Sequence, residues 1–304
     1  MKHLGHFAAG ALALFCGQFA QAQVDVTGPN RFAVEIYTQM AAQERGVNLL
    51  VSPASIHAAL AMTAEAARGE TKREMLETLG LSATDSERHF LLSHLTDKWS
   101  VQRETSDFSL RSANRVWPRS DMLLDETFQQ NSWDVFGAEV TVMDYFGAAE
   151  DSRLEINEWV KAATEDKIPE LLPVGSISPS TAMVLTNAIY FQADWESKFE
   201  PEDSELDVFY SQGGDAHVTF MNGLLLAKTR AAPLLNASIL ELPYVRSAEA
   251  TESVSMFVVL PEEGSSLAEL TQTMAENPDL FSEELTETYT SSRALIGVSL
   301  PKWE

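Results

Sequence analysis

The stretch from Thr181 to Phe199, TAMVLTNAIYFQADWESKF, decides the fold. Its first part, Ala182 to Phe191, is almost unbroken apolar sequence rich in Val, Ile, Tyr and Phe, and Pro179 precedes it. The run is too short for a buried helix and is typical of a strand that is covered on both faces. We therefore expect a central strand of a β-sheet here.

Asn187 is the exception within this apolar strand. Side chains alternate between the two faces of a strand, so Asn187 shares a face with Leu185 and Ile189. A buried amide without hydrogen-bond partners costs roughly 1 to 3 kcal/mol. We expect Asn187 to have partners and to mark a place where polar contacts specify the structure.

Composition limits the classes of partner. The 304 residues are 45% hydrophobic, enough for one large domain or two ordinary ones. The chain has 21 Lys and Arg against 45 Asp and Glu, a net charge of −24. This balance argues against nucleic acid and acidic membranes as partners.

Residues 1–22 have the features of a secretory signal peptide. Lys2 gives a positive start, residues 7–15 form an apolar run, and Ala20-Gln21-Ala22 fits a cleavage site. The single cysteine, Cys16, lies in this segment, and ordinary cleavage is preferred over lipidation. We expect an exported protein without a thiol, which cannot be a cysteine hydrolase or a Cys-ligated metal protein.

Periodicity places helices before most of the strands. Helical spacing is found over residues 31–43, 53–67, 71–80, 86–99, 125–136, 152–168 and 267–275, with capping boxes at 71–74 and 152–155. Alternation predicts strands over residues 107–117, 139–145, 217–221, 224–229, 239–244, 255–260 and 294–300. Ser52 and Pro53 read as the N-cap and first residue of the second helix. With no repeat and no linker, this order predicts a single α+β domain.

Once these elements are placed, the sequence resembles the serpin family. The segments that carry the resemblance follow in order: residues 48–56 (NLLVSPASI), 67–71 (ARGET), 114–117 (NRVW), 156–160 (INEWV), 167–173 (KIPELLP), 186–191 (TNAIYF), 240–244 (LELPY), 256–261 (MFVVLP) and 298–302 (VSLPK). Each segment alone is weak evidence for the family, but together the segments extend over residues 30–304. One departure is Asp166, which stands where the family usually has Gly before the lysine.

The resemblance implies a serpin fold, with three β-sheets and about eight helices, that traps proteases. A serine or cysteine protease cleaves an exposed loop, and the loop inserts as a new strand into the largest sheet. Inhibition of this kind needs no catalytic residue, no cofactor and no metal. A heparin-like cofactor is also disfavoured, because residues 86–103 mix acidic with basic side chains. We expect a monomer whose partner is the target protease.

The family also implies roles for six residues, carried over by position. Ser52, Pro53, Ser55 and Asn187 match the region beneath the sheet where the strands part. Thr186, Asn187 and Trp195 lie on the strand that borders the opening, with Trp195 near the point where insertion starts. Without the family, Ser52 would be an ordinary N-cap, Trp195 ordinary core, and Asn187 a satisfied buried amide.

Past Lys302 the chain contains none of the segments that follow in the family. We find no small-residue hinge, no scissile residue and no closing hydrophobic hairpin. The sequence therefore predicts residues 23–304 as one serpin domain that lacks the C-terminal strands and the reactive loop. We expect these residues alone to fold poorly and not to inhibit.

Two rival classes remain. An enzyme is disfavoured, because the chain has no G-x-S-x-G, H-E-x-x-H or phosphate-binding glycine motif, and His89 and His94 are five residues apart on a helix. A non-inhibitory serpin-fold protein with a binding or chaperone-like role is the alternative. The residues that would decide between inhibition and this alternative belong to the hinge.

Overall fold

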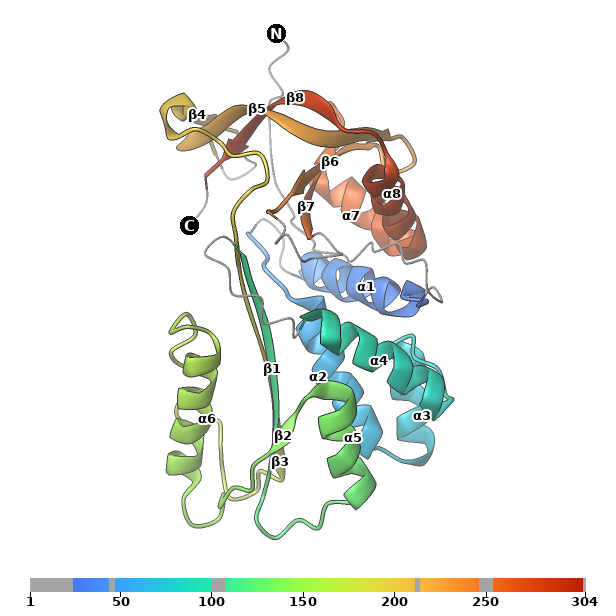
Figure 1. Ribbon diagram of the computed structural model, residues 1–304, viewed down its shortest axis with the longest axis vertical. Helices are drawn as coiled ribbons and strands as arrows, with labels where there is room; N and C mark the ends of the chain where they lie inside the picture. Colours follow the sequence, from blue (N-terminus) through green and yellow to red (C-terminus); the bar gives the residue numbers. More distant parts are fainter. Residues whose placement is uncertain (1–23, 44–46, 100–107, 211–213, 246–253, 303–304) are drawn as a thin grey trace. The chain divides into compact units, whose positions relative to one another are not determined.

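The computed structural model describes residues 24–43, 47–99, 108–210, 214–245 and 254–302 (Figure 1). The predicted signal peptide, residues 1–22 with Cys16, lies outside these ranges. Residues 100–103, the end of the segment whose mixed charge disfavours a heparin-like cofactor, lie outside them as well. Contacts divide the chain into two compact units. We call them the β1–β3 unit (residues 24–32 and 52–192) and the β4–β8 unit (residues 33–51 and 193–304).

The β1–β3 unit carries the Asn187 strand. Its elements are α2 (Pro53–Ala66), α3 (Gly69–Thr78), α4 (Asp85–Trp99), β1 (Phe108–Pro118), α5 (Glu126–Phe136), β2 (Glu139–Val140), α6 (Ala149–Ala163) and β3 (Met183–Ala193). The first residues of α1 (Thr27–Gln43) also belong here. The strands form one sheet in the order β2-β1-β3.

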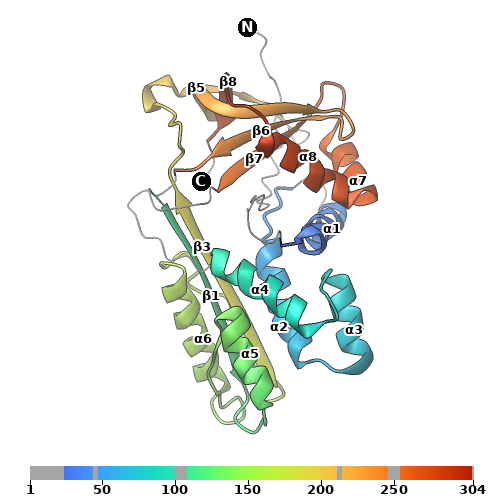
Figure 2. The same ribbon diagram turned by 45° about the vertical axis from the view of Figure 1, so that its right-hand side comes forward.

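Helices cover both faces of the β1–β3 pair. On one face, Trp117 of β1 and Val184 of β3 pack with Ile156 and Trp159 of α6. On the other face, Asn114 of β1 donates to the Phe136 carbonyl at the end of α5. Figures 1 and 2 show α6 on one side of the pair and α5 on the other. Within the apolar segment itself, Thr186 and Ala188 are buried, whereas Phe191 is 40% exposed, so the cover predicted for both faces is incomplete.

The prediction that this segment is a central strand is wrong for the described residues. In the order β2-β1-β3, β3 stands at the end of the sheet and has β1 as its one neighbour. Side-chain hydrophobicity reports what covers the faces of a strand, whereas its place in the sheet depends on which other strands pair with its edges. An apolar run therefore cannot separate a central strand from an edge strand whose faces are covered.

Two predicted capping boxes are also wrong. α3 begins at Gly69 after Arg68 and α6 begins at Ala149 after Ala148, without a side-chain cap in either case. Thr71 and Ser152 therefore lie inside their helices, and Ser152 is buried. The S/T-x-x-E pattern also occurs in the first turns of helices that started earlier, so the pattern alone does not fix the start.

The turn after α6 explains why the helix ends at Ala163, before the predicted end at residue 168. Glu165 and Asp166 have φ values of 50° and 61°, in the left-handed region. Glycine adopts this region without cost, and Asp tolerates it better than most other residues. Asp166 thus fills a glycine-type position with a side chain, and its amide still closes the helix by donating to the Lys161 carbonyl at 2.9 Å.

We expect Asp166→Gly to be more stable than Asp166→Ala by about 1 kcal/mol, because alanine adds the left-handed strain without the local bonding of Asp. Urea denaturation of the two variants measures this difference. The ion pair between Lys161 and Asp166 spans 3.7 Å with both side chains exposed, and its loss is common to both variants. Equal midpoints for the two variants would contradict the left-handed assignment.

The β4–β8 unit contains the larger sheet. Its elements are α1 from residue 33, η1 (Pro201–Asp203), β4 (Glu205–Phe209), β5 (Ala216–Ala232), β6 (Ala237–Pro243), β7 (Ser255–Pro261), α7 (Leu267–Glu276), α8 (Pro278–Thr290) and β8 (Ala294–Pro301). The sheet runs β4-β5-β6-β7, and β8 also pairs with β5. The core of this unit is formed where β6 and β7 pack against the helices α1, α7 and α8. It includes Val34, Ile239, Phe257 and Leu285.

Three elements of this unit differ from the prediction. The two strands expected over residues 217–229 form one strand, β5, whose residues 216–220 pair with β4, residues 220–227 with β8 and residues 228–232 with β6. β4 was not predicted. α8 was not predicted, although Pro278 at its first position is a helix-start signal.

A buried histidine makes the stability of the β1–β3 unit sensitive to pH. His57 of α2 is 5% exposed, contacts Phe32 edge to face, and its Nε2 lies 3.0 Å from the Leu79 carbonyl oxygen. Burial lowers the pKa of His57 below the usual 6.5, although the bond to Leu79 opposes this shift. Between the folded pKa and pH 6.5, the unfolded chain therefore binds more protons than the folded chain.

We expect the free energy of unfolding to fall as the pH drops below about 6.5. His57→Gln should make this dependence shallower, because the glutamine amide does not titrate. Urea midpoints of both proteins between pH 5 and pH 7.5 measure the effect. His217→Gln, at an exposed position of β5, is the matched control and should keep the parent slope.

Candidate sheet-opening site

Ser52 and Ser55 form a cap at the start of α2. The Ser52 hydroxyl donates to Ser55 Oγ at 2.9 Å and accepts from the Ser55 amide at 3.4 Å, and Pro53 occupies the first turn of α2. The predicted N-cap is therefore present. Within the described residues, neither hydroxyl has a hydrogen bond to Thr186 or Asn187, so the structure does not join these serines to β3 by side-chain bonds.

Thr186 is bonded to β1 through a tryptophan. The Trp117 indole N–H donates to Thr186 Oγ1 at 2.9 Å, and the Thr186 hydroxyl lies 3.3 Å from the Arg115 carbonyl oxygen. Trp117 and Thr186 are 0% and 2% exposed. The Tyr145 hydroxyl donates to the Trp117 carbonyl at 2.9 Å, and burial raises the pKa of Tyr145 to about 12. Both the hydroxyl and the indole thus act as neutral hydrogen-bonding groups.

Asn187 lies on the opposite face and is bonded to an asparagine of β1. Its amide nitrogen donates to Asn114 Oδ1 at 2.7 Å, and the Asn114 amide donates to the Phe136 carbonyl at 2.8 Å. A longer contact of 3.5 Å reaches Ser112. Asn187 Oδ1 is buried and has no hydrogen-bond partner among the described residues. The amide that the sequence singled out is therefore half satisfied.

Trp195 belongs to the β4–β8 unit and makes a separate aromatic cluster. Its ring stacks on Tyr244 with centroids 4.6 Å apart and meets Phe199 edge to face at 6.4 Å. Trp195 also forms an isolated antiparallel bridge with Tyr244, and the Glu196 amide donates to the Pro243 carbonyl. Burial raises the pKa of Tyr244 to about 12. This side chain is fixed by packing and backbone bonds of its own unit.

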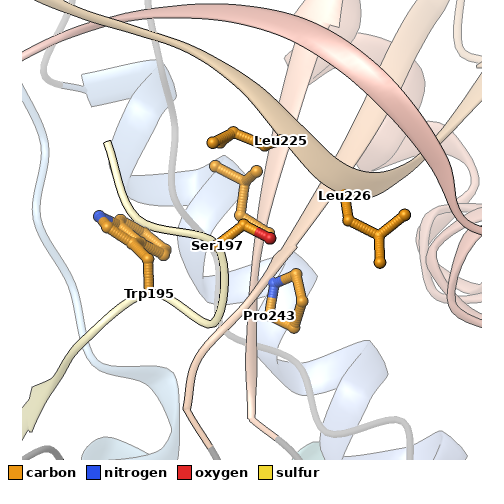
Figure 3. Close-up of a pocket in the computed structure, with 6 residues that line it drawn as sticks. Trp195, Ser197, Leu225, Leu226 and Pro243 are labelled. Atoms are coloured by element: carbon orange, nitrogen blue, oxygen red, sulfur yellow. The ribbon is translucent and has the colours of Figure 1, made fainter. Parts of the chain in front are cut away.

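A small hollow lies beside Trp195 (Figure 3). Trp195, Ser197, Leu225, Leu226, Leu242 and Pro243 line it. It has an apolar lining and lacks a charged group, so it has the character of incomplete packing. Elsewhere, the described residues contain no group of three or more metal-ligating side chains arranged for an ion. No helix within them is both long enough and apolar enough to cross a bilayer.

The predicted residues thus fall into three places. Ser52, Pro53 and Ser55 cap α2, Thr186 and Asn187 bond to β1, and Trp195 stacks within the other unit. Sequence reasoning assigned no role to Trp117, Asn114 or Tyr145. Asn114 and Trp117 lie in the NRVW segment, but a residue's partner 69 positions away leaves no local pattern.

Within the described residues β3 has one unpaired edge, and an edge of this kind is where a further strand can pair. The chain matches the family described as Serpin (serine protease inhibitor) over residues 27–304, and it belongs to that family. The serpin prediction is confirmed. This is a family of protease inhibitors and not of enzymes, so the prediction that the chain is no enzyme is confirmed as well.

Individual relatives support the assignment. Bovine antithrombin-III is 31% identical over 283 residues, and the match covers 90% of this chain and 58% of the relative. Human serpin B9 is 33% identical, with 78% and 61% covered. An Arabidopsis serpin in its native stressed conformation superposes with a TM-score of 0.80 at 24% identity, covering 93% of this chain and 72% of that structure. The chain therefore spans about six tenths of the length of these curated relatives.

The structural match confirms the α+β serpin fold. Eight α-helices are present in the described residues, as the resemblance implied. The described strands form two sheets, β2-β1-β3 and β4-β5-β6-β7 with β8 paired to β5. The prediction of one continuous domain over residues 23–304 remains a prediction.

Proposed function

We propose that the protein is a secreted, monomeric inhibitor of serine or cysteine proteases that adds a strand of its own cleaved loop to the free edge of β3. The observation that carries this proposal is β3 itself. It is 11 residues long, is buried at Thr186 and Ala188, and has one edge without a partner in the described part of the chain.

The physics of such an edge favours strand addition. Each backbone hydrogen bond gained adds about 1 kcal/mol, and side chains of the new strand would be buried against the covering helices. β3 contains no Pro, Lys or Arg, which are residues that commonly protect exposed edges. The buried Asn187 Oδ1, whose side chain bonds to Asn114 of β1, has no partner among the described residues and remains an acceptor for a group that arrives when the sheet rearranges.

We infer that Ser52, Pro53, Ser55, Thr186, Asn187 and Trp195 act in opening the sheet. For Thr186 and Asn187, the support is that Thr186 and the Asn187 nitrogen bond to β1, whereas Asn187 Oδ1 has no partner among the described residues. The roles of Ser52, Pro53, Ser55 and Trp195 rest on the family resemblance. The predicted signal peptide over residues 1–22 supports secretion. A mature protein that starts at Gln23 by mass spectrometry would establish it.

Formation of a covalent protease complex tests the proposal. A chain that carries a family-type cleavable loop after residue 304 should give, with a reactive serine or cysteine protease, a detergent-resistant band at the sum of the two masses. Residues 23–304 alone should give no such band, because no hinge or scissile residue is found in them. A panel that includes trypsin-like, chymotrypsin-like and papain-like enzymes identifies the class.

Each outcome decides one part of the proposal. Cleavage of the looped chain without a stable band would contradict inhibition and favour the non-inhibitory alternative. A stable band with residues 23–304 alone would contradict the assigned role of the loop. Catalytically inactivated protease is the control, because it cannot acylate and should give no band with either chain.

A further inference from the structure

The hydrogen bond between the Trp117 indole and Thr186 is the most isolated polar contact of the β1–β3 pair. Its atoms lie 2.9 Å apart, and both residues are essentially inaccessible to solvent. The surroundings are apolar and include Ile156, Val184 and Trp159, whose ring meets Trp117 edge to face at 5.7 Å. An indole N–H has no other way to be satisfied in such a place.

Trp117 is itself held on three sides. The Tyr145 hydroxyl binds its carbonyl oxygen, Trp159 of α6 contacts its ring, and the Arg115 guanidinium lies 5.2 Å from the ring centroid of Trp117 and 5.0 Å from that of Trp159. Arg115 also pairs with Glu139 of β2. The indole donor is therefore held in place by contacts other than its bond to Thr186.

The opposite edge of β3 has no equivalent contact in the described residues. The buried side-chain bonds of Thr186 and Asn187 go to β1 or to backbone atoms of β1, and the one uncommitted atom at this level is Asn187 Oδ1. Separating β3 from β1 would leave the buried indole N–H of Trp117 without an acceptor. Adding a strand at the other edge of β3 breaks none of these bonds. The two edges of β3 thus differ in how easily they open.

We propose that Trp117 is a positioning residue that locks β3 to β1 through Thr186, so that a strand enters at the free edge of β3 and never between β3 and β1. This inference rests on the proposed function for its consequence. The lock itself can be measured without any protease, so the two proposals can fail separately.

Hydrogen–deuterium exchange on the full 304-residue chain tests the lock. Thr186→Val keeps the shape of the side chain and removes the acceptor of the indole, and it should raise amide exchange in residues 113–117 and 184–188 by about tenfold. Thr186→Ser keeps the hydroxyl and should leave exchange there within about twofold of the parent. Exchange in β6, in the other unit, is the internal control.

The indole proton supplies a second readout that loss of packing alone would not change in this way. In the parent and in Thr186→Ser, the Trp117 Nε1–H should exchange slowly in ¹H–¹⁵N spectra, and in Thr186→Val its resonance should shift upfield and exchange faster. If Thr186→Val should fail to fold, Trp117→Phe, which leaves the Thr186 hydroxyl its contact with the Arg115 carbonyl, is measured in the same way.

These outcomes support or overturn the lock. Faster exchange confined to β1 and β3 in Thr186→Val or Trp117→Phe supports it. Parent-like exchange in the variant that folds would overturn it. An equal rise in β6 would also overturn it, because the contact would then contribute to general stability and would not hold one strand on another.

Discussion

Arg88→Met should destabilise the β1–β3 unit by about 3 to 5 kcal/mol, the usual effect of removing one partner of a buried ion pair. Arg88 of α4 is 0% exposed, and its Nε lies 2.6 Å from Oε1 of Glu65, a residue of α2 that is 7% exposed. The same guanidinium also bonds Asp85 and the Ser82 carbonyl. Without Arg88, the Glu65 carboxylate would be buried with only the weaker contacts to Lys72 and His89.

The pKa of Glu65 agrees with this view of the pair. Burial acts to raise the pKa, but the hydrogen bonds and the charge of Arg88 outweigh it, and the net pKa is lowered. Stability from this carboxylate is therefore present above its unfolded pKa and is lost as the pH falls through the folded value. Arg88→Met should remove this acid dependence together with the stability.

Urea denaturation at pH 7 measures the loss, and two controls define its cause. Glu65→Leu/Arg88→Met should recover most of the stability, because an apolar pair can replace a buried ion pair at little cost. Arg73→Ala removes an exposed residue that pairs with Glu70 and Glu77 and should cost less than about 1 kcal/mol. A double variant as unstable as Arg88→Met would show that the loss of stability comes from lost packing of Arg88 and not from an unpaired Glu65 charge.

Gly80→Ala is the second substitution with a large expected effect, roughly 2 to 4 kcal/mol, because it combines left-handed strain with a clash. Gly80 has φ +63° and lies against Gly28 near the start of α1. A Cβ at Gly80 would lie 2.4 Å from the Cα of Gly28, and a Cβ at Gly28 would lie 2.1 Å from the Gly80 carbonyl oxygen. Two backbones touch here because neither residue has a side chain.

A series of three alanine variants separates the two costs. Gly137→Ala, at φ +60° with open space around it, adds only the backbone strain and should cost about 1 kcal/mol. Gly28→Ala adds only the clash, since no left-handed φ is found at Gly28. Thermal or urea denaturation ranks the three. A Gly80→Ala variant no worse than Gly137→Ala would mean that α1 can move away from α3 without cost.

Local signals in the sequence predicted the parts of this fold that depend on local chemistry. The Ser52–Pro53 cap, the helix over residues 125–136 and the extended conformation of β3 depend on neighbouring residues, and the structure contains all three. Pro278 is a helix-start signal at the first position of α8, but this helix was not predicted. Helix starts inside a longer pattern, at Thr71 and Ser152, were misplaced because their signal is not unique.

The candidate site depends on contacts between residues that are distant in the sequence, and most of these contacts could not be predicted from it. Asn187 could be singled out because an amide breaks an apolar row, but its partner Asn114 is 73 positions away. The edge position of β3 could not be predicted either, because it is a property of the other strands. Roles for Ser52, Ser55 and Trp195 came from the family alone, and the structure leaves each of them in a local contact.

The long strand β5 has a consequence for how the β4–β8 unit unfolds. Its 17 residues pair with three other strands, with β4 and β8 along residues 216–227 and with β6 along residues 228–232. Local unfolding that reaches the middle of β5 therefore removes the pairing partner of β8 and of β6 at the same time. We therefore expect this half of the molecule to melt as one cooperative foldon, with matching opening energies on either side of Ala227.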